Sequence, residues 1–303
     1  MPHTNDLVLV PGGDWDDRIL VCQNGKLVQT FLVVTRRYVV VVDTLINTAT
    51  AEKVVQIARP YLDNGRTLLV VNTHADYDHA WGNALFAGPD ARFPAPILGA
   101  KQCAAAFAES EVVELLTKMQ SEEPEIFGGL CLTPPTVLFD ERLTIDGGDL
   151  TLHLFATPGH TPDHVSIYIP EIETLLAGDA AELPYPAART VEGLPAMRRS
   201  LATLASHQAK RVLYCHAPVE AGPQLLADNI AYFDALEAAC RMAWAHGAPW
   251  PPLAGVDLIA LTDCHYEAIT PHTELWRDVH DYYRTDGHAA QLRMMFDWLV
   301  SAG

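Results

Sequence analysis

The segment from Asn72 to Asn83 limits most strongly what this chain can fold into. It reads NTHADYDHAWGN and follows the continuous apolar run Thr67–Val71, which is typical of a buried strand. Four side chains of metal-binding type stand within six residues: His74, Asp76, Asp78 and His79. Burying two carboxylates and two imidazoles together is unfavourable unless cations compensate them. The segment therefore predicts a metal site at a strand end, and the alternative is a solvated polar loop.

Further downstream, predicted strands are again followed by acidic or imidazole side chains. The pairs of strand and side chain are Leu150–Phe155 with His160 and His164, Thr174–Ala177 with Asp179, and Arg211–Cys215 with His216. Ligands at strand ends on one edge of a sheet are how α/β proteins build their sites. We therefore expect these side chains to meet the segment around His74.

The order of predicted elements indicates the α/β class. Strands are predicted at Leu7–Val10, Ile19–Gln23, Leu27–Val34, Tyr38–Val42, Val137–Phe139 and Val165–Ile169, and helices at Thr50–Ala58, Gln102–Gln120 and Met197–Gln208. Ser121–Pro135 and Leu183–Pro195 are predicted loops, rich in Pro and Gly, which we expect to wall the pocket. The pattern predicts an αβ/βα sandwich of four layers over residues 1–222. Residues 223–303 are expected to form a helical C-terminal extension packed on this core, so that the whole is one domain.

The net charge bears on the kind of binding partner, and the cysteines bear on the cellular compartment. The chain has 20 basic and 38 acidic residues, a formal net charge of −18, which disfavours binding to nucleic acid or to anionic membranes. No signal peptide and no apolar run of membrane-spanning length are visible. The six cysteines form no CxxC pair, which favours reduced thiols in a cytoplasm over a disulfide framework.

The ordered set of ligand residues resembles that of the metallo-β-lactamase superfamily, which includes glyoxalase II, lactonases, arylsulfatases, phosphodiesterases and flavodiiron proteins. The family motif HxHxDH, followed by His, Asp and His, corresponds here to HxDxDH at 74–79 and then to three single residues: His160, Asp179 and His216. The similarity spans roughly residues 7–220 and implies the family's fold with two divalent metal ions. It implies a first site of His74, Asp76 and His160, a second site of Asp78, His79 and His216, and Asp179 as a bridge.

One position departs from the family motif, because Asp76 stands where the family has its second histidine. The family implies zinc, whereas a harder carboxylate ligand favours iron or manganese. Flavodiiron proteins carry a glutamate at the matching position, so the change resembles an exchange of ligand. Aspartate reaches less far than glutamate, and the alternative is that only the second site fills.

The resemblance implies a hydrolase that uses a metal-bridging hydroxide on an ester, lactone, thioester or phosphoester. Asp78 is expected to orient the hydroxide. His164 is a candidate proton donor, or else a packed histidine that supports its loop, and Tyr185 is a candidate for substrate contact, or else a cover over apolar surface. Asp43, at the end of a strand, is expected either to hydrogen-bond a ligating histidine or to cap a turn.

Two other classes of function remain open from the sequence. The first is a diiron redox enzyme, which Asp76 favours, although no flavin domain or rubredoxin-like CxxC pairs accompany it. The second is a non-catalytic binding protein on the same fold. The expected partner is a small-molecule substrate, and the sequence leaves open a homodimer through the helical tail.

Overall fold

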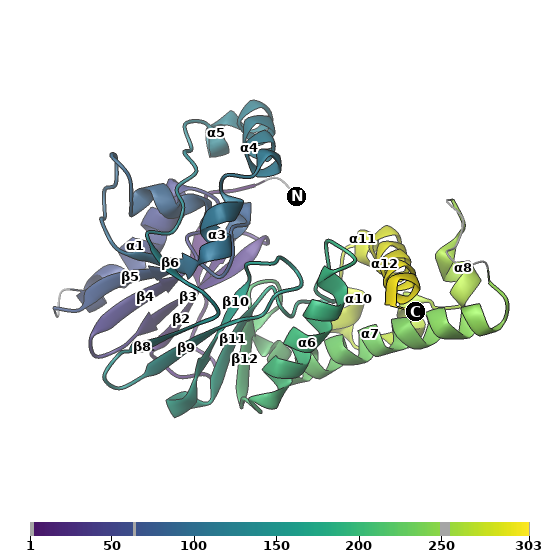
Figure 1. The fold of residues 1–303 in the computed structure, drawn as a ribbon. Helices are drawn as coiled ribbons and strands as arrows, with labels where there is room; N and C mark the ends of the chain where they lie inside the picture. The colour runs from purple at the N-terminus through teal and green to yellow at the C-terminus, as the bar shows by residue number, and fades with distance from the viewer. Residues whose placement is uncertain (1–2, 63–64, 249–254, 303) are drawn as a thin grey trace.

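Two mixed β-sheets pack against each other at the centre of the protein, and helices flank them on both sides (Figure 1). This architecture comes from a computed structural model that describes residues 3–62, 65–248 and 255–302. The first sheet has the strand order β1 (Leu7–Leu9), β2 (Ile19–Asn24), β3 (Val28–Val34), β4 (Tyr38–Val42), β5 (Thr67–Val71), β6 (Ile97–Ala100) and β7 (Val137–Phe139). The second has the order β12 (Arg211–Tyr214), β11 (Thr174–Gly178), β10 (Val165–Ile169), β9 (Thr151–Ala156) and β8 (Arg142–Asp146).

The direction of the strands decides where the loops meet. Strands β4 to β7 run parallel to one another, and β1 to β4 are antiparallel. In the second sheet β8 to β11 are antiparallel, while β11 and β12 are parallel. Parallel neighbours end at the same edge, so the loops after β4 and β5, and those after β11 and β12, leave their sheets side by side.

Helices cover the outer faces of both sheets, as Figure 1 shows. Those of the first half are α1 (Thr48–Leu62), α2 (Tyr77–Ala80), the 3₁₀ turn η1 (Trp81–Leu85), α3 (Lys101–Ala106), α4 (Ser110–Glu122) and α5 (Pro124–Phe127). The second half has η2 (Pro170–Ile172), α6 (Gly193–Ser206), η3 (Val219–Ala221) and the long α7 (Gly222–Ala245), followed by α8 (Leu258–Thr262), α9 (Tyr266–Ile269), α10 (Glu274–Arg277), α11 (Asp281–Arg284) and α12 (Asp286–Ala302).

The buried apolar side chains form two cores. The first core lies between the facing sides of the two sheets and extends to the buried side chains of α1. It contains Phe31, Val54 and Leu154. The second joins the other face of the second sheet to α6, α7 and α12, through residues such as Leu175 and Phe296. The predicted α/β sandwich with a helical C-terminal region is confirmed, and the second core packs that region on the sheet. Helix α7 begins at Gly222, while the domain division at residue 222 stays a prediction.

Several predicted elements differ from those observed. The expected helix Gln102–Gln120 is wrong as one element, because α3 and α4 are separate and Glu109 between them has an extended backbone. Helix α3 buries Cys103, whereas α4 has no fully buried residue and packs on the first core through partly buried side chains: Val112, Leu116 and Met119. The expected loop Ser121–Pro135 contains α5.

Two strands were missed by the sequence analysis. Strand β6 is only four residues long and contains Gly99, and β8 carries charged Arg142 and Asp146 at its ends. Neither segment has a long apolar run in its sequence. Both become strands because they pair with a neighbouring strand in the tertiary structure. Among the described helices, none combines the length and the apolar character needed to cross a membrane.

Candidate metal centre

The loops after strands of both sheets bring the seven predicted metal ligands together. The loop after β5 carries His74 and Asp76 and leads into α2, which begins at Tyr77 and holds Asp78 and His79. The loops after β9, β11 and β12 carry, in turn, His160, Asp179 and His216. All seven are buried or partly buried. The expectation that these strand ends meet at one place therefore agrees with the structure.

Asp179 lies at the centre of the cluster. Its Oδ2 atom is 3.2 Å from His79 Nε2 and 3.3 Å from His216 Nε2. The same oxygen is 3.7 Å from His74 Nε2 and 3.6 Å from His160 Nε2. One carboxylate oxygen thus faces four imidazole nitrogens, which is the placement expected of a bridging ligand.

The three predicted ligands of the second site, Asp78, His79 and His216, bring their donor atoms close together. Asp78 Oδ2 lies 3.3 Å from His216 Nε2 and 3.8 Å from His79 Nε2. The two Nε2 atoms are 3.4 Å apart. This group of ligand atoms, and a second group made by His74, His160 and Asp179, are each compact enough to hold one metal ion.

Groups outside the cluster orient the imidazoles. His79 Nδ1 lies 2.9 Å from Asp43 Oδ2, and His216 Nδ1 lies 2.8 Å from the carbonyl oxygen of Leu27. Each partner accepts a hydrogen bond, so each Nδ1 carries the proton and each Nε2 presents a lone pair to the centre. The expectation that Asp43 bonds a ligating histidine agrees with this contact.

Orphaned polar atoms show that the donor set fits metal ions. Among the described residues, His74 Nε2 and Asp179 Oδ1 are buried without any hydrogen-bond partner. The lone pairs of His79 Nε2 and His216 Nε2 face each other, which is repulsive unless a proton or a cation lies between them. A set of imidazole nitrogens and carboxylate oxygens suits zinc, iron or manganese.

The electrostatics of the cluster point the same way. Burial raises the pKa of Asp179, but the nearby imidazoles of His79 and His216 outweigh it and hold the pKa well below its usual range. Burial lowers the pKa of His79, yet the carboxylates of Asp179 and Asp78 raise it well above its usual value. The carboxylates therefore favour positive charge at this place, and a bound metal ion can supply it in exchange for protons.

Asp76 differs from the other ligands in its contacts. Its Oδ2 atom lies 3.4 Å from His74 Nε2 and 3.3 Å from His160 Nε2, so it faces the first predicted site. Arg189 binds the same carboxylate with both terminal nitrogens, Nη1 to Oδ1 at 3.0 Å and Nη2 to Oδ2. The first site thus contains a carboxylate where the family motif has an imidazole, and an arginine beside it.

His164 contacts the backbone of the candidate bridging ligand Asp179 and does not face the other ligand atoms with a free nitrogen. Its Nε2 atom accepts a hydrogen bond of 2.9 Å from the backbone N–H of Asp179, and its Nδ1 lies 2.8 Å from Thr157 Oγ1. Burial and the neighbouring His74 lower the pKa of His164 well below its usual value. Both ring nitrogens are engaged and the ring is neutral, so the structure favours the supporting role over proton donation.

Tyr185 does not join the ligands. Its ring stacks on Tyr232 with centroids 4.3 Å apart, and its hydroxyl donates a hydrogen bond of 2.7 Å to the carbonyl oxygen of Tyr283. These contacts lie in the second core, between the sheet and the helical extension. Of the two roles that the sequence left open for Tyr185, these contacts favour the cover over apolar surface.

Three side chains at the site were missed by the sequence analysis. Arg189 and Glu182 come from the loop after Asp179, and Asp163 Oδ2 accepts a hydrogen bond of 2.9 Å from the N–H of Ala75. Glu182 Oε1 lies 3.5 Å from His160 Nδ1, and burial together with Asp179 raises the pKa of Glu182 to about 7. Only closeness to a predicted ligand in the sequence could have indicated these residues.

Comparison with solved structures gives the same fold. A metallo-beta-lactamase family protein from Thermus thermophilus is 19% identical, with a TM-score of 0.58 and coverage of 98% of this chain and 94% of that chain. The metallo-beta-lactamase from Pontibacter korlensis is 19% identical with a TM-score of 0.54, covering 74% of this chain and 97% of its own. The sec-alkylsulfatase Pisa1 from Pseudomonas sp. is 18% identical with a TM-score of 0.62, and the match covers 93% of this chain and 49% of that one.

Sequence comparison identifies the family. No curated protein was found to match this chain in sequence. The sequence profile of the metallo-beta-lactamase superfamily matches residues 24–216, which is more than half of the chain and includes all seven predicted ligands. The chain therefore belongs to the metallo-beta-lactamase superfamily.

Proposed function

We propose that this protein is a dinuclear metal-dependent hydrolase acting on a small ester, lactone, thioester or phosphoester. One observation carries the proposal: Asp179 Oδ2 lies between 3.2 and 3.7 Å from the Nε2 atoms of four histidines. A bridging carboxylate between two imidazole groups is suited to hold two cations close together. His74, Asp76 and His160 would hold the first cation and Asp78, His79 and His216 the second, with Asp179 shared between them.

When bound, such a cation pair lowers the pKa of a shared water and polarises the oxygen of the bond to be broken. The protein contributes fixed geometry and charge. Asp78 stays ionised, because the imidazoles of His79 and His216 outweigh the burial that raises its pKa. Its carboxylate can therefore accept a hydrogen bond from the attacking water. Asp43 holds His79 in the tautomer that leaves Nε2 free.

The alternative of a diiron redox enzyme rested on the carboxylate at position 76. Arg189 forms a two-point ion pair with that carboxylate, so the charge of Asp76 is already balanced without a harder metal. Among the residues that the structure describes, no other contact of the site favours redox chemistry over hydrolysis. We therefore retain the hydrolase as the single proposed function.

The first test is the metal content and activity of the purified full-length protein. Elemental analysis is expected to give about one to two zinc or manganese ions per chain after purification without added metal, and about two after reconstitution with excess metal. Hydrolysis is then followed with a panel of carboxylic esters, lactones, thioesters and phosphodiesters. An alkyl sulfate is added because the sec-alkylsulfatase Pisa1 matches 93% of this chain in structure.

A matched pair of variants links activity to the cluster. Asp179→Asn removes the charge that faces four imidazoles and is expected to lower kcat/KM at least about 100-fold. Asp140→Asn makes the same change at an exposed residue paired with Lys101, and should leave activity unchanged. Full activity of Asp179→Asn, or no bound metal even after reconstitution, would contradict the proposed function. Two irons with a charge-transfer band and no hydrolysis would favour the redox enzyme.

A further inference from the structure

The guanidinium of Arg189 lies among the ligand atoms of the first metal site. Its Nη2 atom donates to Asp76 Oδ2 and lies 3.1 Å from His160 Nε2, while Nη1 lies 3.0 Å from Asp76 Oδ1. The two contacts of Nη2 fall on Asp76 Oδ2 and His160 Nε2, the atoms that face the first metal site. A two-point pair of this kind is among the stronger hydrogen-bonded contacts in proteins. Arg189 is therefore an internal cation placed at that site.

The second metal site has no such competitor among its observed contacts. The ion pairs of Asp78 are with His79 and His216, both of which are predicted ligands themselves. A metal ion arriving there displaces only protons from the imidazoles. A metal ion arriving at the first site must also separate Arg189 from Asp76. Metal binding at the first site is therefore less favourable in free energy than metal binding at the second, although the two sites share Asp179.

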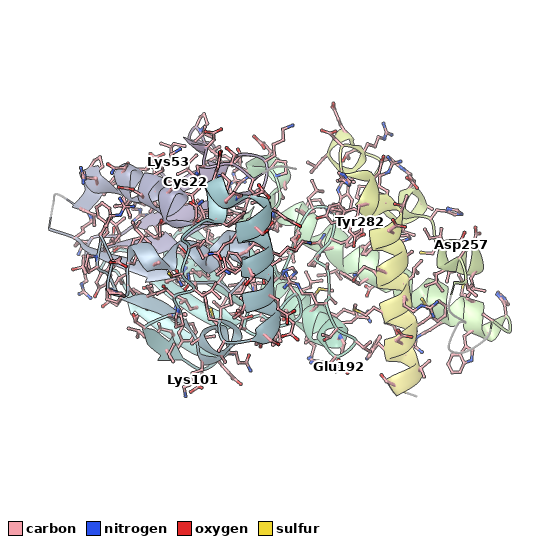
Figure 2. The ribbon with its side chains drawn as sticks, turned by 90° about the horizontal axis from the view of Figure 1, so that it is seen from above. Cys22, Lys53, Lys101, Glu192, Asp257 and Tyr282 are labelled. Atoms are coloured by element: carbon pink, nitrogen blue, oxygen red, sulfur yellow. The ribbon has the colours of Figure 1, made fainter. Side chains whose placement is uncertain are left out.

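The loop that carries Arg189 is fixed at its base and open at its tip. Asn229 of α7 holds the base, accepting from the N–H of Glu182 and donating to the carbonyl oxygens of Glu182 and Pro184. The Arg189 side chain is 52% exposed. Glu192, which follows Arg189 by three residues and is labelled in Figure 2, is also exposed. The Arg189 side chain can thus leave Asp76 for solvent without a change in the base of the loop.

We propose that Arg189 competes with the metal ion for the first site, so that the second site fills first and the first site fills only when the guanidinium leaves Asp76. This inference rests on the dinuclear site proposed above. It also explains the aspartate at position 76, since a carboxylate can pair with either an arginine or a metal ion, whereas the imidazole of the family motif offers no charge for the arginine. Arg189 therefore acts as a reversible block on the first metal site, which is the site that fills last.

The test measures zinc binding rather than activity. Full-length metal-free protein is titrated with Zn²⁺ alone by equilibrium dialysis, with elemental analysis of the bound metal. The wild type is expected to bind one zinc tightly and a second at least about tenfold more weakly. Arg189→Met keeps the length of the side chain and removes its charge, so its second step should tighten by about tenfold or more. Arg189→Lys, which keeps the charge but loses the planar fork, should lie between the two.

The control removes the same charge elsewhere. Arg37 is 54% exposed and pairs with Asp146 at 2.6 Å, before the start of β4 and therefore at the end of the strand opposite to the site. Arg37→Met should bind zinc as the wild type does. Circular dichroism confirms that each variant is folded before titration.

The outcomes separate this inference from the proposed function. An unchanged or weakened second step in both Arg189 variants, with the first step intact, overturns the inference and leaves the hydrolase standing. Equal changes in Arg189→Met and Arg37→Met also overturn it, because the effect is then general to the charge of the protein. If neither the wild type nor any variant binds zinc, both proposals fail together.

Discussion

Replacing Asp43 by asparagine tests how the fold prepares a ligating histidine. Asp43 is buried and has a positive φ of 65°, a conformation that asparagine also tolerates. Its carboxylate makes three hydrogen bonds: to the N–H of Thr73 at 2.7 Å, to Thr73 Oγ1 at 2.7 Å and to His79 Nδ1 at 2.9 Å. The substitution therefore keeps size and backbone while it removes one acceptor and the charge.

The magnitude follows from the count of donors and acceptors. If the asparagine oxygen keeps the N–H of Thr73, its NH₂ group faces His79 Nδ1, which is itself a donor when Nε2 binds a metal. To avoid two opposed donors, His79 must move its proton to Nε2, which then has no lone pair for a metal ion. Changes of this kind lower metal affinity about 10- to 100-fold, or about 1.4 to 2.7 kcal/mol. We expect this loss at the tighter of the two zinc-binding steps.

The assay is competition for zinc between the protein and a chromophoric chelator, with wild type and Asp43→Asn measured side by side. Asp263→Asn is the matched control, because Asp263 also has a positive φ of 50° but its side chain is 98% exposed and pairs with His265 at the surface. The reasoning is refuted if Asp43→Asn keeps wild-type zinc affinity. It is also refuted if Asp263→Asn loses as much.

Three further perturbations are expected to have defined effects. Gly178→Ala places a Cβ 2.5 Å from His164 Nε2 at a φ of +58°, and should lower the free energy of unfolding by about 1–3 kcal/mol in urea titrations. Gly65→Ala is the control and should cost clearly less, because Gly65 also has a positive φ but its added Cβ meets no atom within 4 Å. Burial lowers the pKa of His288, whose ring bonds the carbonyl oxygen of Cys264, so its stabilising effect is present above the unfolded pKa of about 6.5 and is lost as the pH falls below it. Thermal unfolding between about pH 7.5 and pH 5.5 should therefore depend less on pH in His288→Gln than in the wild type. Removing metal with a chelator should lower the midpoint of thermal unfolding by several degrees, since bound ligand stabilises the native state by about 2.7 kcal/mol at 100 times its Kd, and an unchanged midpoint would argue against bound metal.

The fold and the set of candidate metal ligands could be predicted from the sequence because both depend on local patterns. An apolar run followed at once by ligand residues, as at Thr67–Val71 and His74, marks a buried strand that ends at a site. Strands β6 and β8 lacked such a signal, because their pairing depends on neighbours distant in the sequence. The break between α3 and α4 was missed because the two helices pack on the core to different depths, with Cys103 of α3 buried and Leu116 of α4 partly buried.

The surroundings of the ligands were not readable in this way. Asp43 and His79 are 36 residues apart, Glu182 depends on Asn229 of α7, and Arg189 reaches Asp76 across 113 residues. For Tyr185 and His164 the sequence left a chemical and a packing role open, and hydrogen bonds to Tyr283 and Thr157 favour the packing role. Such contacts are set by the direction in which a side chain leaves a loop, and loops have no periodic pattern from which that direction can be predicted.

The sequence by itself determined the class of fold, the family and the set of residues able to bind metal, because periodicity and the spacing of ligand types are properties of the chain. Only the tertiary structure decided which nitrogen of each histidine faces the centre, that Asp179 stands between the two groups, and that Arg189 shares Asp76 with the first site. These features depend on distances of about 3 to 4 Å between segments remote in sequence. The packing of the two sheets and the helical extension alone brings those segments so close.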